Sequence, residues 1–491
     1  MNFESLSKWQ LVSLLSRGFA MSIGILQSFF IVRMLTVGEW GLIQIAISIG
    51  GALGIYQHLG LASGSTREIS QAKNDDAVFK VFLTSLFVRY MMTVPLALGL
   101  FFFSEYLSID KYSHSELIIP LKLYAIVMVF QGAQSILNSV ISGTKRFKHL
   151  FLYQALITFV SLVLFIPFVF FYKINGYFIA MLLFNTISTI VLAILALKPL
   201  KTTFPLPTKS EFKTLLKDLM TISLAIYLVK VIYTLWEKIG PLILGLELTP
   251  EIVGIFAFAM LYAKKIVNVS DAITDVNLPV LSEKFVKNLD DFKITFSQNF
   301  DKVFALILFL GFTAVYWAPQ VVVVLVGSDK YTQSLQMIIP LTYAFIMYSF
   351  INIAKSSVII PAKLTKELIV SFIILILLTL GFYYGTFQIL GNLTAMCYGM
   401  LIGSLGGFAS MVIFSITKLK YSFWTLDHTL LLVQSFAISM VTANPILVLK
   451  VVLYIIFFAL YLWAVRESGF VKDTDFRRYT GKFLNLRLLK K

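Results

Sequence analysis

The sequence predicts an all-α integral membrane protein with fourteen transmembrane helices, arranged as two pseudo-symmetric six-helix lobes followed by two C-terminal helices. Composition is the first observation behind this prediction. Hydrophobic residues make up 58% of the 491 residues and charged residues only 13%. A soluble protein of this length cannot bury so large an apolar fraction, so a bilayer must surround it. Because the apolar stretches run for about 20 residues or more, they are expected to be helices and not the shorter strands of a barrel.

An internal duplication is the second observation. The sequence DKYSHSELIIPL at 110–121 recurs as DKYTQSLQMIIPL at 329–341. The Leu-Thr pair followed by a glycine at 35–41 recurs at 248–254. A repeat of this length within a hydrophobic chain is typical of secondary transporters built from two halves.

Apolar runs between polar breaks place the helices in order. The first lobe, 1–198, has helices near 10–35, 41–63, 78–104, 117–142, 149–172 and 176–198. A basic, proline-containing cytoplasmic linker occupies 199–217. The second lobe, 218–417, has helices near 218–246, 252–277, 300–326, 335–361, 367–389 and 392–417. Two further helices fall near 425–443 and 446–465 within the segment 418–465, and a basic cytoplasmic tail follows at 466–491. Because each lobe has an even number of helices, the lobes are expected to run parallel.

The distribution of basic residues sets the predicted orientation. Net charge is +16, and Lys and Arg concentrate in alternate loops, whereas the intervening loops contain only Lys111, Lys173 and Lys330. Basic loops stay in the cytoplasm, so both termini are predicted to be cytoplasmic. The tail is either a topology anchor or a contact to anionic headgroups of membrane lipids. With this explanation the positive charge gives no reason to expect nucleic acid as a partner.

Charges inside the predicted spans are the candidates for binding. Arg33, Lys122 and Lys450 lie near outer ends, where their side chains are expected to reach the interface. A charge at the bilayer centre costs at least about 2.5–3.5 kcal/mol, so deeper residues are expected to face a hydrated cavity. Five deep cations are predicted to line it and to bind an anionic, phosphate-bearing ligand, and these are Arg17, Arg89, Lys230, Lys264 and Lys355.

Polar stripes at helical spacing support some of these assignments. Such stripes are Lys264-Asn268-Asp271-Asp275, Lys230-Thr234-Glu237 and Tyr348-Asn352-Lys355, while the helix of Arg89 is predicted to have no clear stripe. Buried ion pairs that brace the bundle, such as Lys264 with Asp271, are the alternative explanation.

Titratable groups within the spans are candidates for coupling to protons or sodium ions. They are Glu237, Asp271, Asp275 and His58, and the repeat places His58 in the second helix where Asp271 lies in the eighth. Glu237 is the preferred proton carrier. Structural salt bridges are an equally supported alternative for these acids.

Enzyme, metal and cofactor functions are not predicted. Cys397 is the only cysteine, and the four histidines are scattered. The sequence has no phosphate-binding loop motif for an ATP-driven pump. A membrane glycosyltransferase or polymerase would need a substantial loop or domain outside the membrane, and no predicted loop is long enough.

The chain resembles the polysaccharide flippases, the Wzx-like O-antigen translocases of the multidrug/oligosaccharidyl-lipid/polysaccharide exporter superfamily. The resemblance spans essentially the whole length and rests on topology and on short motifs at 16–18, 35–41, 66–68 and 142–145. It implies lobes that alternate between inward-open and outward-open states. Lipid II flippases share the fourteen-helix plan and a functional arginine in the first helix, for which Arg17 is the nearest match.

The resemblance also implies a substrate and a location. The substrate would be an undecaprenyl-pyrophosphate-linked oligosaccharide for O-antigen, lipopolysaccharide or a related polysaccharide, moved to the periplasmic leaflet of the bacterial inner membrane. The polysaccharide polymerase machinery is then a candidate partner. A lipid II flippase or a multidrug exporter of the same superfamily is the alternative, and the two extra helices favour a lipid-linked substrate over a drug.

Overall fold

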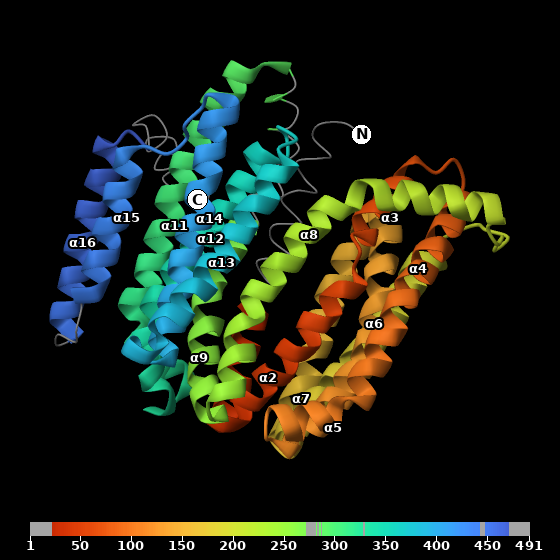
Figure 1. Ribbon diagram of the computed structural model, residues 1–491, viewed down its shortest axis with the longest axis horizontal. Helices are drawn as coiled ribbons and strands as arrows, with labels where there is room; N and C mark the ends of the chain where they lie inside the picture. The colour runs from red at the N-terminus through yellow and green to blue at the C-terminus, as the bar shows by residue number, and fades with distance from the viewer. Residues whose placement is uncertain are drawn as a thin grey trace, which may run out of the picture. The chain divides into compact units, whose positions relative to one another are not determined.

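The computed structural model describes residues 22–271, 281, 284–285, 287–327, 329–441 and 447–470, and every element within them is helical (Figure 1). Ten helices in this part of the chain are long and apolar enough to cross a membrane, and Ser22–Met34 is a shorter apolar helix. The prediction of an all-α, multi-pass membrane protein is confirmed. The count of fourteen helices stays a prediction.

The helices of the first repeat overlap the predicted spans, but the predicted second span, 41–63, is interrupted after Gly54. They are α2 (Val37–Gly54), α3 (Leu61–Gln71), α4 (Asp75–Phe102), α5 (Ser104–Tyr106), α6 (Ile118–Gly143) and α7 (Phe147–Leu197). Within α7 the backbone of Lys173 has φ 51° and ψ −124°, which breaks the helix between the predicted fifth and sixth spans. Local chemistry fixes the starts, since Thr36 forms a capping box before α2 and Asn74 caps α4.

The second repeat and the C-terminal helices complete the chain. They are α8 (Lys209–Glu247), α9 (Pro250–Ala263), α11 (Leu289–Val326), α12 (Leu335–Ala354), α13 (Thr365–Leu390), α14 (Asn392–Leu419), α15 (Leu426–Val441) and α16 (Leu447–Glu467). The residues divide into two compact units. The first unit is Met1–Phe258 with Val322–Ser334, and the second unit is Ala259–Val321 with Leu335–Lys491. The first unit therefore includes α8, which packs on α2, α3 and α4.

A reciprocal contact within the first unit reflects the duplication. A Cβ atom on Gly41 would overlap the carbonyl oxygen of Pro250, and one on Gly254 would overlap the carbonyl oxygen of Val37. Gly41 matches Gly254 in the repeat, and Val37 matches Pro250, so the two contacts are equivalent. Such pairing is the signature of a local two-fold axis. Glycine is required at both positions because the backbones of α2 and α9 approach too closely for a side chain.

The repeated Asp-Lys-Tyr motif has a related role. The Lys330 ammonium donates to the carbonyl oxygens of Val32, Arg33 and Leu35 at 2.9, 3.2 and 2.6 Å. These carbonyls end the first helix, where backbone acceptors lack partners and a cation is favourable. In the other copy of the motif, the Tyr112 hydroxyl donates to the carbonyl of Leu242 in α8 at 3.3 Å. Each copy thus contacts the first helix of the opposite repeat.

Candidate functional site

A break in the second helix of the first repeat positions His58. After α2 the chain forms a 3-10 turn, η1 (Ile55–Gln57), and then turns through Leu59 and Gly60, which both have positive φ, before α3 begins. An interrupted helix at membrane depth exposes polar groups to the protein interior, which is where transporters of this kind place their binding sites. The His58 side chain therefore lies at an interruption and not on a continuous helical face.

Arg89 of α4 lies next to His58 and is fully buried, with 0% of its surface exposed. Its Nη2 atom is 3.0 Å from Nδ1 of His58. A guanidinium group only donates hydrogen bonds, so Nδ1 must accept, and the imidazole is neutral with its proton on Nε2. Nε and Nη1 of Arg89 have no hydrogen-bond partner among the described residues. Unsatisfied buried donors of this kind cost about 1–3 kcal/mol each, so a ligand with acceptor oxygens would gain by binding to them.

Lys230 completes the cluster from α8. The Lys230 ammonium interacts electrostatically with both His58 and Arg89. The Lys230 side chain is exposed, whereas that of Arg89 is buried. Docking of α8 on η1 holds it there, since the Tyr227 hydroxyl donates to the carbonyl of Tyr56 at 3.2 Å. A small apolar cluster of Ile55, Tyr227 and Val231 supports the same contact.

We call Arg89, His58 and Lys230 the cationic cluster. Two of its three members are positively charged, and within the described residues no carboxylate forms an ion pair with Arg89 or Lys230. The arrangement suits an anion with several oxygens, because Arg supplies paired donors and Lys a point charge. All three residues were predicted from the sequence, Arg89 and Lys230 as substrate ligands and His58 as a coupling candidate.

The expectation that α4 lacks a polar stripe is wrong. Ser85, Arg89 and Thr93 follow one another at four-residue spacing, and all three are fully buried. Thr93 donates to Oε1 of Gln57 at 2.9 Å, and Ser85 bonds to Ser65 at 2.7 Å. The serine and threonine spacing was readable in the sequence, but these residues also satisfy their own helix backbone and so give a weak signal.

A second polar cluster lies in the second unit, around Asp271. The Asn352 amide donates to Oδ1 of Asp271 at 2.6 Å, and the charge of Asp271 acts on the partly buried Lys355. Lys355 begins a π-helical turn, η6 (Lys355–Ile359), after α12, and such turns occur often at functional sites. Lys264 lies in a second 3-10 turn, η4 (Lys264–Ile266), which interrupts the eighth helix. We call Asp271, Asn352 and Lys355 the paired cluster.

The remaining predicted residues have different outcomes. Glu237 forms an ion pair with its neighbour Lys238 at 3.1 Å on α8. Arg17 and Asp275 lie outside the described residues, so their roles stay predictions. The expectation that Lys450 reaches the interface is wrong. Its side chain is fully buried, donates to Gln320 at 2.9 Å and lies over the ring of Tyr316.

These features, namely repeated halves, interrupted helices and charged clusters in an apolar helical bundle, define a membrane transporter fold, and known structures agree. The lipid II flippase MurJ in an inward closed conformation matches with a TM-score of 0.70 at 14% identity, covering 96% of this chain and 99% of that chain. An inward-facing multidrug resistance transporter of the MATE family in the MOP superfamily matches with a TM-score of 0.63 at 15% identity, covering 88% and 100%. A MOP superfamily transporter from Pyrococcus furiosus matches with a TM-score of 0.55 at 16% identity, covering 84% and 97%.

A family model described as polysaccharide biosynthesis protein matches residues 30–336, more than half of the chain. The protein belongs to this polysaccharide biosynthesis family. A search of curated proteins finds no match. The family match agrees with the expected role in polysaccharide biosynthesis, and the fold matches those of a MOP superfamily transporter and of a lipid II flippase.

Proposed function

We propose that this protein is a flippase for an undecaprenyl-pyrophosphate-linked oligosaccharide. It moves the O-antigen or a related repeat unit by alternating access from the cytoplasmic to the periplasmic leaflet of the bacterial inner membrane. The family match and the transporter fold support a role in polysaccharide transport. The observation that carries the proposal is the cationic cluster, in which a buried arginine has two donors without partners.

The pyrophosphate is the part of the substrate that this cluster would recognise. Lys230 is exposed and would meet the anion first, whereas Arg89 is buried behind it. Movement of the anion toward Arg89 would satisfy the two orphaned donors and offset the mutual repulsion of the cations. Arg17, Lys264 and Lys355 remain proposed ligands of acidic groups on the substrate.

Ion coupling would proceed through His58 and the acids. An added proton on His58 would remove its acceptor at Nδ1 and place three cations together, so it is disfavoured while the cluster is empty. A bound anion would offset the positive charge of the cluster and so favour protonation of His58. Substrate binding and proton uptake would therefore favour each other. Glu237, Asp271 and Asp275 are the other candidates, with protons or sodium ions as the coupling species.

Other functions fit the clusters less well. Catalysis is not proposed, because the matched family and folds give no support for a glycosyltransferase or polymerase reaction. A cationic cluster would repel positively charged drugs. A lipid II flippase is the second candidate, because its substrate carries the same anionic link and the MurJ fold matches over nearly the whole chain.

The experiment is a transport assay in liposomes with three substrates. Undecaprenyl-pyrophosphate-linked oligosaccharide, lipid II and a cationic dye are compared, and the sugar that reaches the opposite leaflet is detected with an impermeant lectin. We expect movement of the oligosaccharide lipid at a rate well above that of lipid II and no movement of the dye. Transport of the dye without either lipid would contradict the proposal, and preferential movement of lipid II would replace it with the second candidate.

A further inference from the structure

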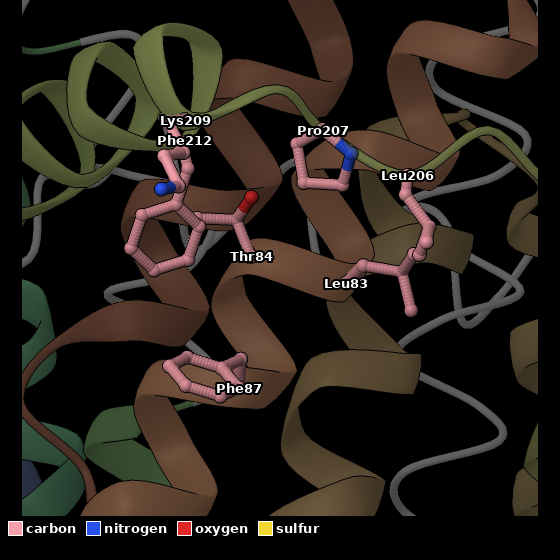
Figure 2. A pocket seen from close by; sticks show the side chains of 7 residues that line it. All are labelled: Leu83, Thr84, Phe87, Leu206, Pro207, Lys209 and Phe212. Carbon is pink, nitrogen blue, oxygen red and sulfur yellow. The ribbon is translucent and has the colours of Figure 1, made fainter.

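The first unit contains an open apolar cavity that the proposed transport mechanism does not use. Its volume is about 500 Å³, and it lies between α4, the linker and the start of α8 (Figure 2). The lining residues are Leu83, Thr84 and Phe87 of α4, Leu206 and Pro207 of the linker, and Lys209 and Phe212 of α8. An apolar site of this size holds water poorly and suits a hydrocarbon chain.

The cavity is open toward the surroundings of the protein. The exposed fractions of Phe87 and Leu206 are 58% and 79%. The Phe212 ring packs edge-on against Phe87 with a centroid distance of 5.6 Å, which forms one wall. A chain from the surrounding bilayer could therefore enter sideways without any opening of the bundle.

Lys209, the one charged residue that lines the cavity, begins a basic stripe, and this stripe indicates which headgroup the hydrocarbon chain would carry. Lys209, Lys213 and Lys217 follow at four-residue spacing on the first turns of α8, so their side chains share one face. The adjacent face is apolar: Leu219 is fully buried in the core of this unit, and Phe212, Leu215 and Leu216 pack against that core. An amphipathic segment with a basic stripe is typical of helices that lie at an anionic membrane surface. Positive-inside topology puts it on the predicted cytoplasmic side.

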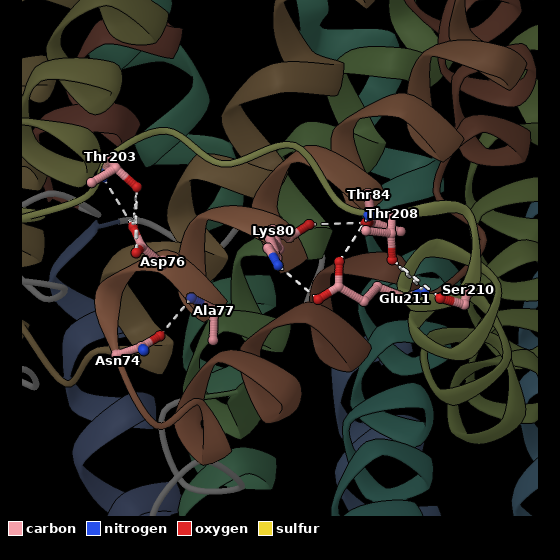
Figure 3. A network of polar contacts seen from close by, with 9 residues as sticks. All are labelled: Asn74, Asp76, Ala77, Lys80, Thr84, Thr203, Thr208, Ser210 and Glu211. Atoms are coloured by element: carbon pink, nitrogen blue, oxygen red, sulfur yellow. Dashed lines mark hydrogen bonds and ion pairs between the residues drawn. The ribbon is translucent and has the colours of Figure 1, made fainter.

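Nearby acids are occupied by other partners and leave Lys209 and Lys213 positive. The Lys80 ammonium pairs with Glu211 at 2.6 Å, and Glu211 also accepts from the Thr208 backbone at 2.8 Å (Figure 3). Asp76 accepts from the Thr203 backbone at 2.9 Å and so fixes the linker to α4. Lys209 forms no ion pair in the part of the chain that the structure describes. These contacts hold the linker and the start of α8 against α4, and so they maintain the walls of the cavity.

We propose that this cavity binds an anionic phospholipid of the surrounding bilayer, with one acyl chain against Phe87 and Phe212 and the phosphate on Lys209 and Lys213. The apolar lining accounts for the acyl chain, and the basic stripe that begins at Lys209 accounts for a preference for an anionic headgroup. The site is separate from the cationic cluster and does not depend on the proposed substrate.

Quenching of tryptophan fluorescence by brominated lipids tests this directly. A Phe87→Trp variant is reconstituted in vesicles that contain increasing fractions of brominated phosphatidylglycerol or brominated phosphatidylcholine, and quenching beyond that of the starting protein is recorded. We expect half-maximal extra quenching at a several-fold lower fraction of the anionic lipid. Adding K209Q and K213Q should remove this preference, whereas the matched pair K73Q and K145Q, on exposed basic loops, should leave it unchanged.

A variant whose larger side chain occupies part of the cavity provides an independent test. Leu206→Trp, at a highly exposed linker position, should weaken anionic lipid binding without any change of charge, as read from the phospholipid retained by purified protein in mass spectrometry. Equal quenching by the two lipids would mean ordinary bilayer contact and would overturn the proposal. A preference that survives K209Q and K213Q would overturn it as well.

Discussion

The cationic cluster and the paired cluster occupy related places in the two repeats but differ in charge balance. His58 and Asp271 match in the repeat, and each lies after a 3-10 turn that interrupts its helix. His58 has a guanidinium partner from α4, whereas Asp271 has an amide partner from α12 and acts on Lys355. The two repeats therefore keep a titratable side chain at this place but surround it with different chemistry.

This difference predicts opposite responses to removal of charge. In the cationic cluster a cation can be deleted without leaving a carboxylate behind, so function should suffer more than stability. In the paired cluster deletion of one charge leaves its partner uncompensated, so stability should suffer first. The four predictions below test this contrast, from the largest expected effect to the smallest.

Replacement of Arg89 should give the largest effect on binding. Arg89→Met removes charge-assisted hydrogen bonds to the anion worth about 2–3 kcal/mol, which corresponds to roughly 30- to 150-fold weaker binding. Stability should stay equal or rise, because two buried donors without partners disappear. Binding of a fluorescent pyrophosphate-linked lipid and the Tm in detergent measure the two effects. Arg67→Met, at an exposed position of α3, is the matched control. A Tm that falls along with binding would assign Arg89 a structural role.

Replacement of Asp271 should lower stability. Asp271→Leu removes the acceptor of Asn352 and the charge that acts on Lys355. Because Asp271 is exposed within its unit, we expect a loss of about 1–2 kcal/mol, below the 3–5 kcal/mol of fully buried pairs. The double variant with Lys355→Met should recover much of the Tm. Absence of recovery would show that the two residues do not act as a pair.

His58 should link substrate binding to protons. In the parent protein, affinity for the pyrophosphate-linked lipid should rise by up to about tenfold per pH unit as pH falls through the titration of the ligand-bound imidazole, because the bound state takes up one proton. In His58→Gln this component should disappear, leaving only the titration of the ligand itself. The measurement is a binding curve at several pH values for both proteins. Identical slopes would exclude His58 from coupling and leave Glu237, Asp271 and Asp275.

The sequence was sufficient for the fold because the dominant signals are strong and local. Long apolar runs, the repeated Asp-Lys-Tyr motif and the Leu-Thr turn led to the correct class, and the structure explains the last two by close contacts at Gly41 and Lys330. Clusters were harder to predict, since they depend on which helices pack together. Arg89 contacts His58, and Lys450 donates to Gln320. In both cases the partner is more than 30 residues away in the sequence.

The smallest effect is expected at the exposed ion pair between Lys80 and Glu211, which provides the baseline for both clusters. The hydrogen bond from Lys80, followed by that from the Thr208 backbone, lowers the pKa of Glu211 from 4.5 to about 2. A lowered pKa means that the ionised carboxylate stabilises the fold above pH 4.5 and that this contribution is lost as pH falls toward 2. Since water screens the pair, Glu211→Gln should reduce the Tm at pH 7 only slightly, and the difference from the parent should shrink below pH 4.5. Thermal scans of both proteins from pH 7 to pH 4 measure this. A decrease at pH 7 as large as that of Asp271→Leu would mean that charge removal destabilises this protein wherever it occurs, and the contrast between the two clusters would lose its meaning.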